Sequence, residues 1–140
     1  MPLNRIERYR NTEALTADPA VVVRLLLEET MRTVRVAIDH CKEGRIAERG
    51  RAASRAVELL TALLEDLNTE DSPDLAGSLR KLYDYCQYRV IEGHPKGDVR
   101  FFEAVLAVLG DIAEAWVEVL EREKHDAPAT AQEVAEPAWG

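Results

Sequence analysis

Four long stretches of this chain place apolar residues at steps of three and four, and clusters of helix-breaking residues separate them. Such spacing puts the apolar side chains on one face of an α-helix. The first stretch follows Asp18 and Pro19, which are favoured at an N-cap and at the first helical position. It predicts a helix that begins at Pro19 and ends at Gly44. The predicted inner face comprises Val22, Val23, Leu26, Thr30, Thr33, Val34, Ala37 and Cys41.

Two further helices are predicted in the middle of the chain. The second runs from about Ile46 to Leu67, and its stripe comprises Ala53, Ala56, Val57, Leu60, Leu63, Leu64 and Leu67. The third begins at Pro73 and should stop at residues 93–95, because proline cannot continue a helix and glycine suits a left-handed cap. The inner face of this third helix is predicted to comprise Leu75, Leu79, Leu82, Cys86 and Val90.

The fourth helix is predicted to begin after the N-cap Asp98 and to fade near Lys124. Its apolar residues alternate steps of three and four, which is typical of a helix-bundle seam. That seam comprises Phe102, Val105, Leu109, Ile112, Trp116 and Leu120.

Short turns connect these helices, so each helix must run antiparallel to the next. We therefore expect an all-α, antiparallel up-and-down four-helix bundle over residues 19–124. A chain of 140 residues can bury such a core without disulfides or metals. We interpret residues 1–18 as an N-terminal capping segment. Residues 125–140 contain two prolines, and we interpret them as a disordered C-terminal tail.

The net charge of −8 disfavours nucleic acid as a partner, because lysine and arginine supply most of that affinity. No apolar run is long enough for membrane insertion, and no signal peptide is visible at the N-terminus. Cys41 and Cys86 lie on apolar helical faces, which is typical of free thiols in a reducing compartment. We therefore expect a cytoplasmic protein. Residues 42–55, with five basic and two acidic residues, are either a solvated helix face or a local docking patch.

The sequence lacks the motifs of the enzymes that use a helical bundle. Di-iron bundles need Glu-x-x-His on two facing helices, but none of His40, His94 and His125 has Glu three positions before it. Cys41 and Cys86 do not form C-x-x-C, and no glycine-rich phosphate loop occurs. We therefore expect no catalytic residues, no metal and no cofactor. An enzyme or metal protein on the same scaffold is the least favoured hypothesis.

Several large apolar residues are predicted to lie off these seams, which suggests a second packing surface. This surface could be covered by the N-terminal segment, by a second subunit in a homodimer, or by a partner helix. Ile6 and Tyr9 in the N-terminal segment are three positions apart, so one helical turn would put them on one face. The predicted partner-binding residues are Ile6, Tyr9, Leu27, Met31, Leu59, Tyr85, Phe101 and Val108.

Six short motifs are individually weak but together fairly specific in their order and spacing between residues 6 and 120. They are Tyr9, Leu15-Thr16-Ala17-Asp18-Pro19, Leu82-Tyr83-Asp84-Tyr85, Arg89-Val90-Ile91-Glu92, Asp98-Val99 and Ala115-Trp116. Through them the chain resembles the family of the flagellar export chaperone FliS. It departs from the family at Ile6, where a tyrosine is frequent. It departs again at residues 26–29, where Glu29 stands at a position that is often glycine.

The resemblance implies a bundle that binds the disordered C-terminal segment of flagellin. Such a chaperone prevents premature polymerisation and delivers flagellin to the flagellar type III export apparatus, including its export gate. The resemblance also implies that the N-terminal segment covers the binding region when no client is present, which gives Ile6 and Tyr9 a capping role. The alternative is a chaperone or adaptor for a different secretion-system client on the same bundle.

Overall fold

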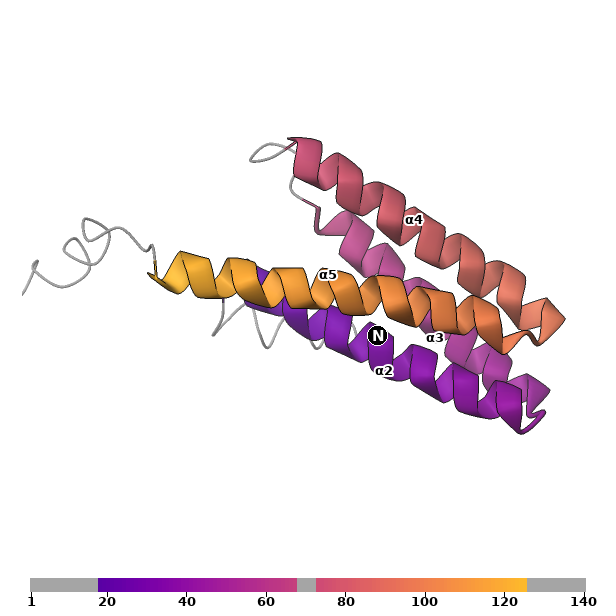
Figure 1. The fold of residues 1–140 in the computed structure, drawn as a ribbon. Helices are drawn as coiled ribbons and strands as arrows, with labels where there is room; N and C mark the ends of the chain where they lie inside the picture. Colours follow the sequence, from indigo (N-terminus) through magenta and orange to yellow (C-terminus); the bar gives the residue numbers. More distant parts are fainter. Residues whose placement is uncertain (1–17, 68–72, 126–140) are drawn as a thin grey trace, which may run out of the picture.

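The computed structural model describes residues 18–67 and 73–125, and these residues form four helices (Figure 1). The helices are α2 (Pro19–Lys42), α3 (Ile46–Glu65), α4 (Pro73–Lys96) and α5 (Val99–His125). No strand occurs within these two ranges, so the predicted all-α class is confirmed. The predicted capping segment and C-terminal tail lie, apart from Asp18 and His125, outside the described residues.

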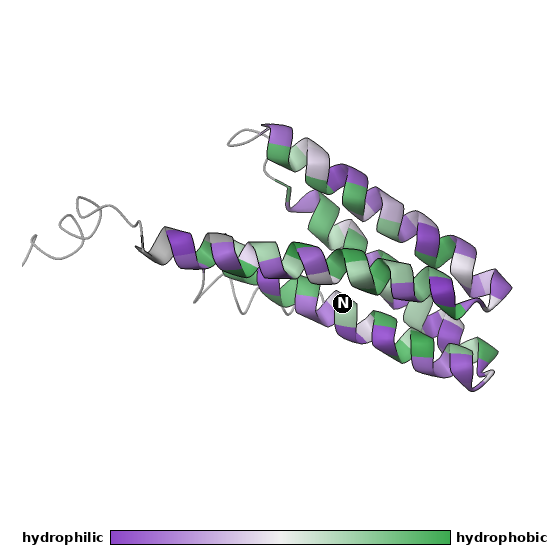
Figure 2. Cartoon of the chain, in the orientation of Figure 1, coloured by the Kyte–Doolittle hydropathy of each residue, from purple (hydrophilic) through white to green (hydrophobic). Residues whose placement is uncertain are grey.

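The four helices form a ring in which each helix has two neighbours. Helix α2 packs against α3 and α5, and α4 packs against the same two helices. The buried apolar residues of the four helices form one core cluster. Figure 2 shows apolar and hydrophilic residues interspersed along each helix. This arrangement confirms the predicted four-helix bundle. The largest fully buried side chains are Tyr83, Phe102, Leu26, Leu27, Leu59, Leu60, Leu63, Leu109, Val34, Val90, Val105 and Thr30.

Two aspartates cap helices as predicted. Asp18 Oδ1 accepts a hydrogen bond from the backbone N–H of Ala20 at 2.8 Å, with Pro19 in the first helical position. Asp98 Oδ1 accepts from the backbone N–H of Arg100 at 3.0 Å, at the start of α5. The Arg100 guanidinium also binds this carboxylate, and these bonds lower the pKa of Asp98 to about 2. Both caps satisfy N–H groups that the first helical turn leaves free.

The predicted end of the third helix at residues 93–95 is wrong, because α4 continues through Pro95 to Lys96. Gly97, rather than Gly93, takes the left-handed conformation, with φ of 60°. Its N–H donates to the carbonyl of Gly93 at 2.9 Å and so closes the last turn. Pro95 has no backbone N–H, so its position in the last turn removes one hydrogen bond of α4. The bond from Gly97 that ends the helix is kept.

The inner face of α4 also differs from the prediction. Tyr83 is 1 % exposed and belongs to the core, whereas Leu75 and Leu82 are 49 % and 39 % exposed. Cys86 and Val90 are buried as predicted. The apolar pattern of this helix includes residues on both sides of the core-facing stripe, so spacing alone does not identify which of them is buried.

The turns at one end of the bundle are held together by polar contacts, and we call this the closed end. Arg49 is only 7 % exposed, and its Nε donates to His94 Nδ1 at 3.3 Å. The Cys41 thiol donates to the carbonyl of Gly97 at 3.0 Å. These contacts join the α2–α3 turn to the α4–α5 turn.

Gly93 allows α4 and α5 to approach closely at the closed end. A Cβ atom at this position would lie 2.5 Å from Phe101 Cβ and 3.2 Å from Phe101 Cγ. Because Phe101 lies in the first turn of α5 and its Cβ is attached directly to the backbone, the two backbones would have to separate. The absence of a side chain at residue 93 is therefore a packing requirement of the α4–α5 pair.

We predict that Gly93→Ala destabilises the protein by about 1–3 kcal/mol, because the added methyl group overpacks this contact. The usual helix preference for alanine over glycine, about 1 kcal/mol, acts in the opposite direction. Gly77→Ala is the matched control, since Gly77 is exposed in the same helix and has no neighbour within 4 Å. Urea unfolding followed by circular dichroism should show loss for the first variant and a small gain for the second. Equal gains would contradict the packing argument.

Candidate functional site

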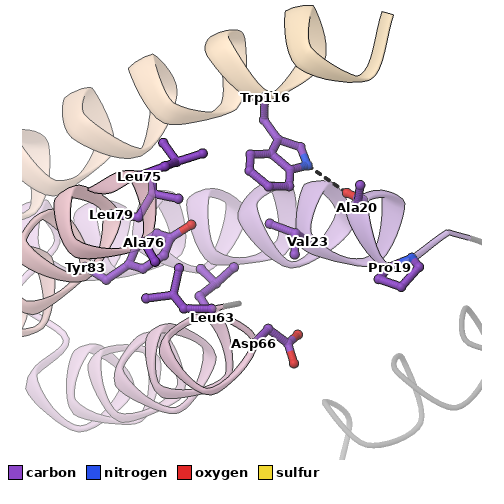
Figure 3. A pocket seen from close by; sticks show the side chains of 11 residues that line it. Pro19, Ala20, Val23, Leu63, Asp66, Leu75, Ala76, Leu79, Tyr83 and Trp116 are labelled. Atoms are coloured by element: carbon purple, nitrogen blue, oxygen red, sulfur yellow. Dashed lines mark hydrogen bonds between the residues drawn. The ribbon is translucent and has the colours of Figure 1, made fainter. Parts of the chain in front are cut away.

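An apolar pocket of about 270 Å³ lies at the end of the bundle opposite the closed end, which we call the open end (Figure 3). Here the first turn of α4 diverges from α5 (Figure 1). All four helices or the residues next to them supply lining side chains, so the pocket belongs to the bundle rather than to one helix pair. The lining residues are Pro19, Ala20, Val23, Leu63, Asp66, Leu67, Leu75, Ala76, Leu79, Tyr83 and Trp116.

Trp116 joins α5 to the start of α2 at the edge of this pocket. Its indole Nε1 donates to the carbonyl oxygen of Ala20 at 2.7 Å, as the dashed line in Figure 3 shows. The ring is half-buried and packs against the core cluster. The hydrogen bond fixes the indole so that its apolar ring is available as a wall of the pocket.

The base of the pocket is formed by residues that are nearly inaccessible to solvent. Leu63 and Tyr83 are each 1 % exposed, and Ala76 is 4 % exposed. Burial, and then the proximity of Cys86 and Asp66, raises the pKa of Tyr83 above its ordinary value. Its hydroxyl is therefore neutral at physiological pH, and the base of the pocket carries no charge.

The rim of the pocket is more accessible. Val23, Leu67 and Leu79 are half-buried, and Leu75 exposes 49 % of its surface. Asp66 is the charged side chain in the lining. Predominantly apolar walls with one acidic group suit the apolar side chains of a peptide better than a small polar substrate.

The chemistry of the described residues gives no sign of catalysis at this pocket. Within residues 18–67 and 73–125, no cluster of His, Cys, Asp and Glu is arranged to hold a metal ion. Burial raises the pKa of Cys86 to about 12, so its thiol is protonated and a poor nucleophile. None of the described helices is both long enough and apolar enough to cross a membrane.

Two predicted partner-binding residues belong to the core. Leu27 is 0 % exposed and Leu59 is 1 % exposed, so the prediction that they lie off the seams is wrong. Each helix packs against two neighbours in the ring, and its buried stripe is therefore wider than a single seam. Ile6 and Tyr9 lie outside the described residues.

The other four predicted residues are half-buried or exposed. Met31 and Val108 are half-buried against the core, and Met31 lines a shallow groove between α2 and α5. Tyr85 is 42 % exposed on α4. Phe101 is half-buried, with the Arg89 guanidinium 4.1 Å from its ring centroid. Arg89 thus lies close to both Tyr85 and Phe101, but none of the predicted residues that the structure describes lines the apolar pocket.

The residues that line the pocket were mostly predicted as seam residues. Val23, Leu63, Leu67, Leu79 and Trp116 all follow the helical spacing of a core. What distinguishes most of them is their position near the open ends of the helices, where fewer neighbouring turns can cover them. The sequence therefore contained a signal for the site: the apolar seams continue to the ends of the helices, where a neighbouring helix leaves them partly uncovered.

Comparison with known proteins gives a consistent result. The family model described as "Flagellar protein FliS" matches residues 2–123. The chain is similar to the flagellar secretion chaperone FliSB of Pseudomonas aeruginosa, with 27 % identity over 71 % of this chain and 79 % of the relative. It is also similar to the flagellar secretion chaperone FliS of Salmonella typhimurium, with 26 % identity over 75 % of this chain and 78 % of the relative.

A third relative, the flagellar secretion chaperone FliS of Vibrio cholerae, is 22 % identical over 78 % of this chain and 80 % of its own length. These relatives are chaperones, which agrees with the expectation that this protein is not an enzyme. The match over nearly the whole chain also confirms the resemblance seen in the sequence motifs. The chain belongs to the FliS family of flagellar secretion chaperones.

Proposed function

We propose that this protein binds the disordered C-terminal segment of flagellin in the cytoplasm, prevents its premature polymerisation and delivers it to the flagellar type III export apparatus. The observation that carries the proposal is the apolar pocket at the open end, in a chain of the FliS family. The pocket provides walls from all four helices, and Leu75 exposes its side chain there.

A flexible client segment fits such a site for physical reasons. Apolar side chains gain about 25 cal/mol per Å² when they leave water for the pocket walls. The segment orders as it binds, which costs typically 2–5 kcal/mol of the gross interaction energy. Binding is therefore reversible, as a chaperone that later releases its client requires. The holding function needs one client per chaperone.

We also propose that residues 1–18 cap the pocket when no client is present. Pro19 and Ala20, which directly follow this segment, are themselves lining residues of the pocket. The segment therefore ends at the rim of the site that it would cover. In this proposal Ile6 and Tyr9 contribute the apolar side chains that compete with flagellin.

The client is tested most directly with flagellin itself. Mixed with this protein, intact flagellin should co-elute with it in size-exclusion chromatography, and flagellin that lacks its C-terminal segment should elute separately. Equal co-elution of both forms would place the contact elsewhere on flagellin. A pull-down that recovers another exported protein and no flagellin would favour the alternative, a chaperone or adaptor with a different secretion-system client.

The pocket is tested by placing a charge in it. We predict that Leu75→Glu lowers the affinity for flagellin at least about tenfold, which corresponds to about 1.4 kcal/mol, because an apolar contact is replaced by a carboxylate that must lose water. Ile91→Glu is the control, since Ile91 is 58 % exposed in the same helix and does not line the pocket. Isothermal titration calorimetry should show a change of less than about twofold for this control. A greater loss for Ile91→Glu would move the site to the outer face of α4.

The cap is tested by shortening its two apolar side chains. The double variant Ile6→Ala and Tyr9→Ala should leave thermal unfolding of the bundle unchanged. It should also increase the affinity for flagellin, because a competing segment binds less well. A large loss of thermal stability would instead assign the two residues to the core.

A further inference from the structure

A groove between α2 and α3 has a chemistry unlike that of the apolar pocket. Arg32 and His40 from α2 face Arg51 and Arg55 from α3, and Glu48 is the acidic side chain in the lining. The groove has a volume of about 290 Å³. It is therefore a locally basic site on a protein whose net charge is −8.

The groove explains part of the basic stretch noted in the sequence. Within residues 42–55, Arg49 points inward to the closed end and is 7 % exposed, so it does not contribute to the surface. Arg51 and Arg55 do line the groove, and α2 adds Arg32 and His40 from outside the stretch. The basic site is thus a product of helix pairing rather than of one sequence segment.

Two side chains that line this groove each have a buried nitrogen atom without a hydrogen-bond partner among the described residues. These atoms are Nδ1 of His40 and Nη2 of Arg55. The two side chains come from opposite walls of the same groove. Neither atom is accessible in this structure, so a ligand oxygen accepts from them only after the side chains turn toward the groove. That exchange would recover part of the about 1–3 kcal/mol that an unpartnered buried donor costs.

The arginines of α3 have only weak partners within their own helix. Arg51 Nη2 lies 3.2 Å from Glu48 Oε1, and Arg55 Nη1 lies 3.4 Å from Glu58 Oε2. These carboxylates are 42 % and 61 % exposed, and exposed ion pairs contribute at most about 1 kcal/mol. An incoming anion can therefore replace them at little cost.

Arg32, in contrast, is held in a defined position. Its Nε and Nη2 bind the two carboxylate oxygens of Glu29 at 3.0 and 2.7 Å. The Glu29 side chain is 9 % exposed, so this pair is better shielded from water than those of α3. Glu29, the residue that departs from the small residue frequent in the family, thus positions one wall of the groove.

We propose that this groove binds a carboxylate side chain from an acidic segment of a second protein. The guanidinium groups of Arg51 and Arg55 donate to the carboxylate from the α3 wall, and His40 lies on the opposite wall. A nucleic acid is disfavoured, because the basic lining of the groove is confined to Arg32, His40, Arg51 and Arg55 and offers no extended basic track for successive phosphates. A single carboxylate needs only the local donors.

The groove and the apolar pocket can be occupied at the same time. On α2 the pocket lining ends at Val23 and the groove lining begins at Arg32, nine residues or about 13 Å further along the helix. On α3 the groove ends at Arg55 and the pocket begins at Leu63. The chaperone therefore has a surface for an acidic partner that leaves the proposed client site free.

The test uses a fluorescein-labelled hexaglutamate peptide and its hexaglutamine counterpart, followed by fluorescence anisotropy at low salt. Hexaglutamate should bind saturably, with chemical-shift changes in the His40 ring, and hexaglutamine should not. Arg51→Gln with Arg55→Gln should weaken binding at least about tenfold. The control variant Arg80→Gln with Lys81→Gln removes the same charge from exposed positions on α4. It should change the affinity for hexaglutamate by less than about twofold. Arg51→Gln alone, at an exposed position, should weaken binding without affecting the fold.

Three results would overturn the proposal. Equal weakening of hexaglutamate binding by both double variants would show a general charge effect. Equal binding of hexaglutamine and hexaglutamate would show that the groove does not recognise the carboxylate group. If inorganic phosphate shifts the His40 ring signals and hexaglutamate does not, the groove is a site for free anions. The Leu75→Glu variant should bind hexaglutamate normally, and the variant with Arg51→Gln and Arg55→Gln should still co-elute with flagellin. Failure of the groove proposal and failure of the client proposal are therefore distinguishable.

Discussion

The close approach of α4 and α5 at Gly93 is the constraint on which the rest of the architecture depends. Phe101 occupies the space that a side chain at residue 93 would need, so the two helices meet tightly beside their connecting turn. Arg49 and Cys41 then attach this turn to the opposite helix pair. Because the helices are drawn together at this end, divergence is confined to the other end, where the apolar pocket opens.

The bundle thus separates two kinds of binding chemistry along its length. The open end offers apolar walls with an uncharged base, which favours contact with apolar side chains and has little directional specificity. The α2–α3 groove offers fixed donors to a single anionic group, which favours specificity over buried area. In the proposed function, the chaperone can use these two modes independently, one for its client and one for an acidic partner.

The agreement between sequence and structure is closest where local chemistry determines the outcome. The N-caps Asp18 and Asp98 satisfy backbone N–H groups of their own helices, so their roles follow from a few neighbouring residues. The end of α4 is different, because Gly93 and Gly97 both suit the left-handed position, and in the structure Gly97 takes it while Gly93 packs against Phe101. The candidate site was missed for a related reason, since seam spacing does not report whether a neighbouring helix covers each residue.

For residues 18–67 and 73–125, the sequence by itself determined the four helices, their approximate limits and their antiparallel connectivity, because spacing, caps and short turns are local properties. Its motifs also indicated the family. Only the tertiary structure decided which apolar residues are covered. Leu27 and Leu59 are buried because each helix has two neighbours, while Leu75 is exposed because α4 diverges from α5 at the open end. Burial depends on the positions of other helices, and the pattern along one helix does not contain those positions.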